Sequence, residues 1–467
     1  MVLCFLIVSL LAALFTGLSR NRCLAAVFAF LFYAAQLAFA LWIVLRGRGE
    51  TVLSFFTLDN LGAMFHLLTA VIAPVVYRQS LRYLDTEPVR EFRIYSLALI
   101  GLCLSVTGVY YADNAAVTWI FLEATTLATA ALVYHRRTAR SLEATWKYLF
   151  VSSVGIAVAY LGILLLSTAV TGNEGLSYRQ LLLAVPGANP LYMKVAFLVI
   201  LTGYSCKIEV FPLYTVGVDA NYAAPTPASA LISTALVNAG FVAFFRIYRV
   251  MAVSEVYDWC RNVLILAGLL SLLAGAVYLR RTNNYKRFLS YSTVENLGIV
   301  LIGLGVGGIG VFAALFHLAV HSLLKAGMFL QIAQVGRFFG TYRMNRTGNY
   351  LNLYRIGGAT VMMGLVGLLA FPPSGLFVSE FLIFREMIAT RRWWLLTVFV
   401  LLMCLVVYTL CRRFAGLAFR PEAAGPTRPE AISRTATWLQ IALMTAVMVA
   451  GIVQPRFLVD FINGMLM

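Results

Sequence analysis

Residues 309–333 read IGVFAALFHLAVHSLLKAGMFLQIA, an apolar run longer than the roughly 20 residues that a helix needs to cross a bilayer. Inside this run, His317, His321 and Lys325 recur every four residues, so they share one face of the helix. A charged side chain at the centre of a bilayer costs at least about 2.5–3.5 kcal/mol. Because a neutral imidazole both donates and accepts hydrogen bonds, the stripe favours a water-linked proton relay.

Two other interpretations of this stripe stay open. Histidines four residues apart can bind a metal ion, but the glutamate of the H-E-x-x-H pattern is missing and Lys325 would repel a cation. The two histidines could also be isolated residues of the protein core. The relay is favoured because three further charged residues lie in apolar runs, namely Glu123, Lys207 and Glu380.

The composition is that of a polytopic membrane protein. Of the 467 residues, 61% are hydrophobic and 12% are charged, whereas soluble domains have roughly 25% charged residues. The 36 lysines and arginines outnumber the 19 acidic residues, but most basic residues lie in short loops between apolar runs, as the positive-inside rule describes. We therefore expect a lipid bilayer around the chain and no nucleic acid bound to it.

The cysteine pattern gives no sign of a redox centre. Seven cysteines form no C-x-x-C pair and lie mostly within apolar runs. That spacing is wrong for an iron–sulfur cluster or a zinc site. We therefore expect no cofactor, no metal and no catalytic residue in this chain, and electron chemistry would belong to partner subunits.

The fold class expected is an all-α polytopic membrane protein with about fourteen transmembrane helices. Their approximate limits are residues 1–19, 23–46, 59–77, 95–112, 114–134, 148–171, 193–215, 225–248, 261–279, 288–304, 309–333, 355–388, 393–415 and 436–455. The boundary between the fourth and fifth spans is marked only by Asp113-Asn114. The arginine-rich loops would face the cytoplasm, which places both termini outside.

Prolines interrupt two of these spans, at Pro212 in the seventh and at Pro372-Pro373 in the twelfth. Each broken span is the fourth helix of a five-helix block, formed by spans 4–8 and by spans 9–13. Matching breaks in two blocks with an odd number of helices indicate two inverted repeats with ion sites at the breaks. The expected segments are residues 1–94 (three N-terminal helices), 95–250 (first repeat), 251–415 (second repeat) and 416–467 (C-terminal helix and tail).

Lys207 precedes Pro212 by five residues, so the helix break would let water reach a buried ammonium group. Glu123 is the natural counter-charge, in a Lys–Glu pair that opens and closes. A static ion pair that locks two helices is the alternative. Glu209 would be either a second partner of Lys207 or a loop-facing acid near the break.

Glu380 follows the second break, where its carboxylate would be the last protonatable group before the outer face. The alternative is a helix cap, since Ser379 and Glu380 could begin the second half of the broken helix. Glu295 occupies in the second block the place that Glu123 has in the first, which makes it a possible secondary member of the relay.

Five stretches of the chain resemble the antiporter-like subunits of respiratory complex I, and within that superfamily the F subunit of group 4 membrane-bound hydrogenases. They are FLEATTLATAALVYHRRTARSLEATWKYL (121–149), KIEVFPL (207–213), YKRFLSYSTVENLG (285–298), HLAVHSLLKAGMFL (317–330) and PPSGLFVSEFLIF (372–384). The resemblance covers roughly residues 95–415. The first stretch favours the hydrogenase branch over the quinone-reducing branch.

The resemblance implies a proton path formed by the acid of the fifth helix and the lysines of the seventh and eleventh. It ends at the acid or lysine of the twelfth helix. The matching residues here are Glu123, Lys207, Lys325 and Glu380. The chain departs from the family pattern in Val216-Gly-Val-Asp-Ala-Asn221 and in having Tyr214, Asn238 and Asn296 where relatives often have histidine or lysine. These departures imply a shorter or rewired route, or a subunit that has lost pumping.

The function implied is a proton-translocating membrane subunit of a hydrogenase-like or complex I-like redox complex in the cytoplasmic (inner) membrane of a prokaryote. Its partners would be other membrane subunits and a soluble arm with iron–sulfur and possibly nickel–iron subunits. Two alternatives are a subunit of a multi-subunit cation/proton antiporter and a non-pumping membrane anchor.

Overall fold

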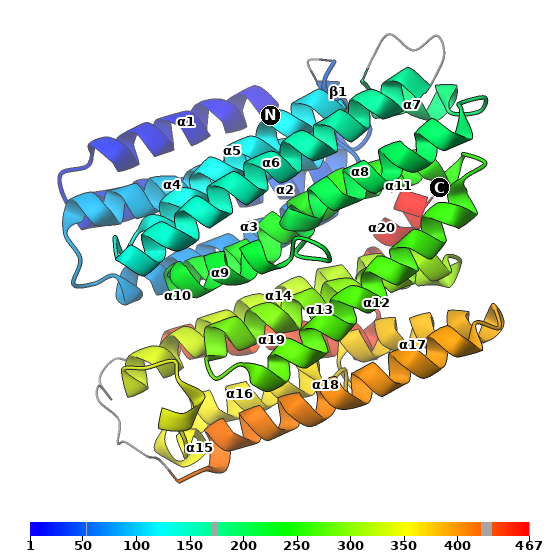
Figure 1. The fold of residues 1–467 in the computed structure, drawn as a ribbon. Coiled ribbons are helices and arrows are strands. Elements are labelled where there is room, and N and C mark those ends of the chain that lie inside the picture. The colour runs from blue at the N-terminus through cyan, green and yellow to red at the C-terminus, as the bar shows by residue number, and fades with distance from the viewer. Residues whose placement is uncertain (53, 170–175, 422–431, 467) are drawn as a thin grey trace. The chain divides into compact units, whose positions relative to one another are not determined.

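The computed structural model describes residues 1–52, 54–169, 176–421 and 432–466, and nearly all of its regular structure is helical (Figure 1). The all-α fold expected from the sequence is therefore confirmed. Contacts divide the chain into two compact units, Met1–Cys260 and Arg261–Met467. The division falls within the first two turns of α12 (Tyr257–Arg281).

In the first unit, α4 packs against α5, α5 against α6, and α6 against α8. Its elements are α1 (Val2–Leu18), α2 (Arg22–Trp42), the π-helical η1 (Ile43–Gly47), β1 (Thr51–Val52), β2 (Phe56–Thr57), α3 (Asn60–Tyr83), α4 (Val89–Tyr111), α5 (Ala115–Tyr134), α6 (Ala139–Ala169), α7 (Tyr178–Ala184), α8 (Pro190–Ile208), α9 (Thr215–Ala223), α10 (Thr226–Leu231), the π-helical η2 (Ile232–Leu236) and α11 (Val237–Ala252). The two strands pair as an antiparallel hairpin.

The second unit is built around α14, which contacts α13, α16, α17 and α19. Its elements after α12 are α13 (Tyr285–Val306), α14 (Ile309–Phe339), the 3₁₀ turn η3 (Met344–Arg346), α15 (Tyr350–Leu353), α16 (Arg355–Leu368), α17 (Gly375–Ala389), α18 (Trp393–Phe419), α19 (Arg434–Val453) and α20 (Arg456–Leu466). Because α14 is surrounded, nearly all of its side chains are buried, including those of the His317–Lys325 stripe.

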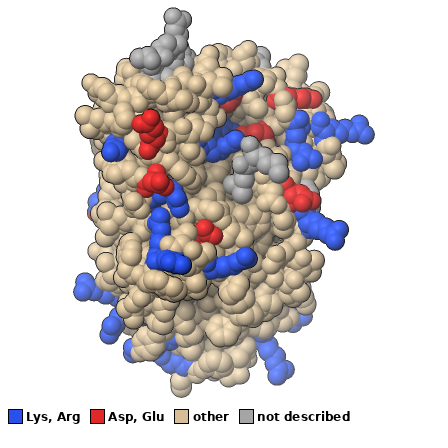
Figure 2. Space-filling view, turned by 90° about the vertical axis from the view of Figure 1, so that its right-hand side faces the viewer, with Lys and Arg blue, Asp and Glu red and all other residues tan. Residues whose placement is uncertain are grey.

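Twelve helices of the described residues are long and apolar enough to cross a membrane. Of two shorter apolar helices, α1 coincides with the first expected span and α16 with the first part of the twelfth. Most of the face in Figure 2 is neither acidic nor basic, as suits a chain that is 12% charged. The total of fourteen crossings, the inverted relation of the repeats and the four segment limits stay predictions.

Helix boundaries follow local capping chemistry. The expected boundary at Asp113-Asn114 is correct, since α4 ends at Tyr111 and α5 begins at Ala115. The Asn114 side chain accepts hydrogen bonds from the backbone N–H groups of Ala116 and Val117, at 2.9 and 3.3 Å. Such a cap satisfies donors that have no partner in the first turn of a helix.

The two spans predicted to be broken are interrupted at Pro212 and at Pro372-Pro373, whereas α3 continues through Pro74. The seventh is divided into α8, which ends at Ile208, and α9, which begins at Thr215. The twelfth is divided into α16 and α17, which are separated by residues 369–374. Proline lacks a backbone N–H and cannot continue the hydrogen-bond ladder of a helix.

Some helices extend beyond the expected spans. The helix α6 begins at Ala139 instead of residue 148, because hydropathy detects only the apolar part of a helix and its first turns carry charged side chains. One of these, Lys147, forms an i,i+4 ion pair with Glu143 on the exposed face, which supports the helix outside the apolar run. The π-helical turn η2 within the buried span Thr226–Ala252 was not predicted.

Candidate functional site

Lys207 lies in the last turn of α8, where its side chain is 1% exposed. Its Nζ donates hydrogen bonds to Thr126 Oγ1 at 2.9 Å and to the Tyr148 hydroxyl at 3.0 Å. A longer bond of 3.4 Å reaches Thr125 Oγ1. An ammonium group has three donors, and these three neutral oxygens supply an acceptor for each of them.

The threonine hydroxyls are oriented by their own helix. Thr125 and Thr126 each donate to the carbonyl of Leu122, at 2.6 and 3.2 Å. Their lone pairs are therefore left to accept from Lys207. The α5 helix thus stabilises a charged lysine with hydroxyl oxygens, a role that the sequence analysis did not assign to these residues although they lie two and three positions after Glu123.

Glu123 does not pair with Lys207 in this structure. Its Oε1 accepts a hydrogen bond of 2.5 Å from Ser153 Oγ on α6. Ion pairs among the described residues include Glu87–His135, Glu91–Arg137, Glu143–Lys147 and Asp59–Arg246. The static Glu123–Lys207 ion pair is therefore not observed, since Glu123 is hydrogen bonded to Ser153 and Lys207 to hydroxyl oxygens.

Glu209 lies at the break after α8, as the left-handed residue (φ 59°, ψ 42°) that caps the helix. Its side chain is buried against α9, where Oε1 accepts from Asn221 Nδ2 at 3.2 Å. Gly217 makes room for it, since a Cβ there would lie 2.3 Å from Oε1. Glu209 is thus a buried acid at the break rather than one that faces the loop.

The α11 helix covers the other side of Lys207. A Cβ at Gly240 would lie 2.8 Å from Lys207 Cβ, so the close approach of α8 and α11 requires glycine there. Asn238, two residues earlier, is 1% exposed. The resemblance to antiporter-like subunits marked Asn238 as a departure, and the structure places it on the helix that packs against the lysine.

The second cluster of ionisable groups surrounds α14. Lys325 is fully buried and its Nζ donates to the backbone carbonyl of Leu289 on α13 at 2.9 Å. Glu295, three turns along from the start of α13, is close enough to Lys325 and to Glu380 for their charges to interact. Glu295 therefore belongs to the same cluster as Lys325 and Glu380.

A chain of hydrogen bonds connects Glu295 to α17. Asn296 Nδ2 donates to Glu295 Oε2 at 2.7 Å, and Asn296 Oδ1 lies 3.1 Å from His317 Nε2. The other ring nitrogen of His317, Nδ1, lies 2.9 Å from Ser379 Oγ. Because an amide oxygen only accepts, His317 carries a proton on Nε2. The polar chain thus crosses from α13 through α14 to α17.

His321 lies one turn along α14, with its ring stacked near that of His317 at a centroid distance of 6.2 Å. The expectation that both histidines share a helix face is therefore correct. Neither ring nitrogen of His321 has a protein hydrogen-bond partner among the described residues. Buried polar groups normally have such partners, so this imidazole is the point of the cluster most in need of water.

Glu380 is not the cap of the second half-helix, so that alternative is wrong. The helix α17 begins at Gly375, and its cap is Ser374, whose Oγ accepts from the backbone N–H of Leu376 at 3.2 Å. Glu380 lies in the second turn and is 8% exposed. The expected cap lay too far along the chain, because only Ser374 separates Pro373 from the start of α17.

Metal binding is the alternative for the His317–His321 pair, and it would need further ligands close to the two rings. Among the described residues there is no cluster of three or more histidine, cysteine, aspartate or glutamate side chains that could hold a metal ion. Lys325 also lies in the same stripe as the two histidines and would repel a cation. The arrangement suits proton exchange between hydrogen-bonded groups better than metal binding.

The sequence analysis did not assign several residues of the site to the relay. Tyr148, Ser153, Leu289 and Ser379 contact the predicted residues through hydrogen bonds. A hydroxyl or a carbonyl in an apolar span gives no signal of its own in the sequence. Asn296 did give one, since it stands where relatives tend to have histidine, but its contact with His317 required the fold.

Ionisable side chains buried in membrane-spanning helices, with Lys207 and Glu380 next to helix breaks, are typical of polytopic membrane proteins that move ions. Residues 112–406 match the family described as NADH:quinone oxidoreductase/Mrp antiporter, transmembrane region, and the chain belongs to this family. A hydrogenase-4 component F homolog of Methylacidiphilum infernorum is 31% identical over 352 residues, which cover 72% of this chain and 73% of that protein.

Solved structures have the same fold. A chain of the membrane-bound sulfane sulfur reductase, an archaeal respiratory membrane complex, superposes with a TM-score of 0.87 and 21% identity and covers 99% of this chain and 96% of that one. A chain of respiratory complex I from Thermus thermophilus gives a TM-score of 0.81 and 20% identity, with 98% of both chains covered. These likenesses confirm the expected fold class.

Proposed function

We propose that this chain is a proton-translocating membrane subunit of a hydrogenase-like or complex I-like complex. The observation that carries the proposal is the buried chain Glu295–Asn296–His317–Ser379, in which each polar group is hydrogen bonded to the next. Such a chain is expensive to bury unless it is fully satisfied. Family membership supports the assignment, because relatives in the family include a hydrogenase component and complex I subunits.

In the first unit, Lys207 is the group that binds and releases a proton. The oxygens of Thr125, Thr126 and Tyr148 stabilise its ammonium form without a carboxylate partner. Movement of Glu123 from Ser153 towards the lysine would add a negative charge and strengthen the binding of the proton. The two positions of Glu123 therefore provide a means of controlling when Lys207 holds its proton.

In the second unit, His317 accepts both charge states without losing a hydrogen bond. When the ring is neutral, Ser379 donates to Nδ1. When the ring is charged, Nδ1 donates to Ser379 Oγ, and the serine hydrogen points to the carbonyl of Leu376, 2.8 Å away. The ring can therefore gain or lose a proton when the Ser379 hydroxyl rotates, and no helix has to move.

Water is proposed to complete the second cluster at His321, whose ring nitrogens require partners. Glu295 interacts electrostatically with Lys325 and with Glu380, so it connects the two. A change of protonation at one of them alters the energy of charging the next. That coupling is the physical basis on which a proton can be moved in a defined order.

The partners proposed are other membrane subunits and a soluble arm with iron–sulfur and possibly nickel–iron centres. The location proposed is the cytoplasmic membrane of a prokaryote with both termini outside. Support comes from the charge of the loops and from the complexes to which relatives belong. The ion moved is proposed to be the proton because the buried donors include two imidazoles and two amines, which do not bind Na⁺.

The test is coupled ion flux by the complex reconstituted in liposomes, with His317→Phe as the variant and His135→Gln as the control. His135 lies at the end of α5 and pairs with Glu87, outside both clusters. We expect proton uptake to fail in His317→Phe, to persist in His135→Gln and to be independent of Na⁺. A flux that requires Na⁺ would favour the cation/proton antiporter, and an unchanged flux in His317→Phe would favour a membrane anchor.

A further inference from the structure

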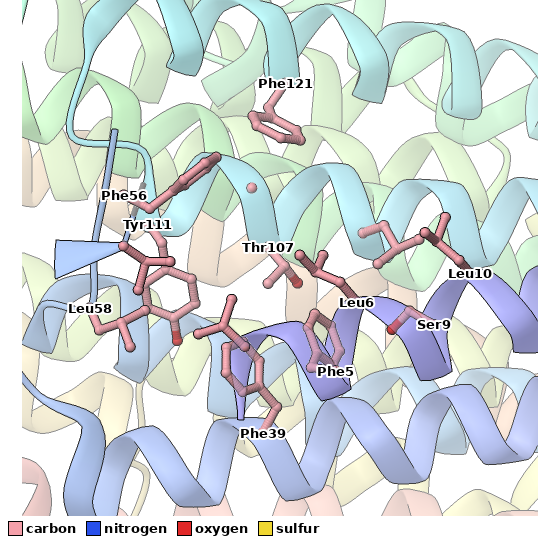
Figure 3. Close-up of a pocket in the computed structure, with 14 residues that line it drawn as sticks. Phe5, Leu6, Ser9, Leu10, Phe39, Phe56, Leu58, Thr107, Tyr111 and Phe121 are labelled. Carbon is pink, nitrogen blue, oxygen red and sulfur yellow. The ribbon is translucent and has the colours of Figure 1, made fainter. Parts of the chain in front are cut away.

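A cavity of about 330 Å³ lies in the first unit, away from Lys207, between α1 and α5 (Figure 3). Its floor is one face of α4, formed by residues 104, 107, 108 and 111, which recur at helical spacing. One wall is the stripe of α1 that includes Val2, Phe5 and Leu6. The hairpin contributes Val52 and Phe56, and the α1 residues of the lining extend from Val2 to Leu10.

The hydroxyl groups in this cavity are already used by the protein. Thr107 donates to the carbonyl of Cys103 at 2.8 Å. Tyr111 lies 2.9 Å from His66 Nδ1, while His66 Nε2 lies 2.6 Å from Gln36 Oε1. Because Gln36 Oε1 can only accept, Nε2 carries the hydrogen of a neutral His66 and Nδ1 accepts from Tyr111. Neither hydroxyl therefore has a hydrogen left for a ligand.

Ser9 is the third hydroxyl, buried on the α1 wall without a hydrogen-bond partner among the described residues. A helical serine can turn its hydroxyl to a carbonyl of its own preceding turn, so it makes little demand on a ligand. The remaining lining is apolar. Such a surface does not attract water and has no set of polar groups to orient a polar molecule.

The chemistry of the lining suits an acyl chain. The α1 wall from Val2 to Leu10 is about 12 Å long at 1.5 Å per residue, and the lining residues of α4 extend from 104 to 111. A hydrocarbon chain gains free energy on such an apolar surface and needs no hydrogen-bond partner. We therefore take a single extended hydrocarbon chain as the occupant.

The cavity has a side from which membrane lipid can enter. Leu6 and Leu10 line it and are 41% and 66% exposed, so this edge of α1 faces outward. At the hairpin end, Gly49 N–H donates to the Leu58 carbonyl, and Leu58 N–H donates to the Glu50 carbonyl, each at 2.9 Å. These bonds hold the segment with the exposed Arg46 and Arg48 beside a cavity-lining residue.

We propose that this cavity binds one acyl chain of an anionic phospholipid whose headgroup lies beside Arg46 and Arg48. The lipid would fill the space between α1 and α5 and hold α1, which contacts the rest of the unit through α2 and α4, in place. Arginines next to a bilayer attract anionic headgroups by about 1 kcal/mol each, or about fivefold in affinity. This function is separate from proton movement.

The test is photolabelling of the full chain, purified from membranes, with phosphatidylglycerol that carries a diazirine at the end of one acyl chain. Mass spectrometry of the labelled peptides locates the chain. We expect labels within residues 2–10 or 104–111. Two variants, Leu104→Trp on α4 and Leu6→Trp on the exposed edge of α1, should each lower this labelling about tenfold by filling the cavity.

The matched control is Leu127→Trp, which makes the same change on the outward face of α5, where the side chain is 63% exposed. Its labelling should equal that of the wild type. Arg46→Ser and Arg48→Ser should each weaken labelling about fivefold. Equal labelling by phosphatidylcholine, or full labelling in both tryptophan variants, would overturn the proposal. Because Leu6 is exposed, Leu6→Trp remains informative if Leu104→Trp does not fold.

Discussion

His317 Nδ1 lies 2.9 Å from Ser379 Oγ, and the same hydroxyl lies 2.8 Å from the carbonyl oxygen of Leu376. One serine hydrogen cannot serve both acceptors at once. Its two positions match the neutral and the charged imidazole. The pair therefore couples the protonation of the His317 ring on α14 to the orientation of the Ser379 hydroxyl on α17, the second half of a broken helix.

Replacing Ser379 tests this coupling. We expect Ser379→Ala to lower proton translocation about tenfold, because the charged ring of His317 loses an acceptor worth about 1.5 kcal/mol or more. The measurement is proton uptake by the reconstituted complex. Ser322→Ala is the control, since Ser322 is a buried serine of α14 that donates to the carbonyl of Leu318. Equal flux in Ser379→Ala and wild type would leave His317 without a relay role.

Lys207→Ala and Glu123→Ala should each abolish translocation while the complex still assembles. Lys207 is held by three oxygens and Glu123 by Ser153, so neither is needed as the partner of the other to fold. The control is the exposed pair Glu143 and Lys147, replaced by alanine in the same way. If the buried and the exposed variants pump alike, Lys207 has only a structural role.

Glu380→Gln should stop translocation with little loss of stability, because the amide keeps the size of the side chain but carries no titratable proton. Glu380→Lys should restore part of the flux, since an amine also carries a proton. Flux at several pH values is the measurement. Glu386→Gln, on the same helix and packed against Gly308, is the control. Normal flux in Glu380→Gln would require another exit for the proton.

Asp113, in the linker between α4 and α5, predicts a pH dependence of stability. Burial raises the pKa of this carboxyl above its usual 3.8, while the charge of Arg246 opposes the shift. The folded state therefore binds the proton more tightly than the unfolded state, and stability falls as the pH rises from about 4 through the raised pKa. Asp113→Asn should remove this slope in thermal unfolding measured between pH 4 and 7. A slope that persists in the variant would assign it to another group.

The purified chain should contain no metal or chromophore. The described residues form no cluster of three or more potential metal ligands, and the cysteines are free. Metal analysis and visible absorbance of the single subunit give the answer. Iron, nickel or zinc in a one-to-one ratio would contradict both the interpretation of the cysteines and that of the His317–His321 stripe.

The sequence by itself determined the helical membrane fold and the two breaks at Pro212 and Pro372-Pro373, because these depend largely on local properties, although α3 continues through Pro74. Apolar runs of span length must be helices in a bilayer, and a proline removes a donor wherever it occurs. The i,i+4 spacing also placed His317 and His321 on one face correctly. Each of these features is decided within a few turns of one helix.

Only the tertiary structure decided which groups meet. Thr125, Thr126 and Tyr148 surround Lys207, and Ser153 holds Glu123, through contacts between helices that no spacing within one helix reveals. The contact of His317 with Ser379 likewise joins residues 62 positions apart. A buried charge takes whichever oxygen the packing of helices brings near, so its partner is a property of the fold and not of the segment that carries it.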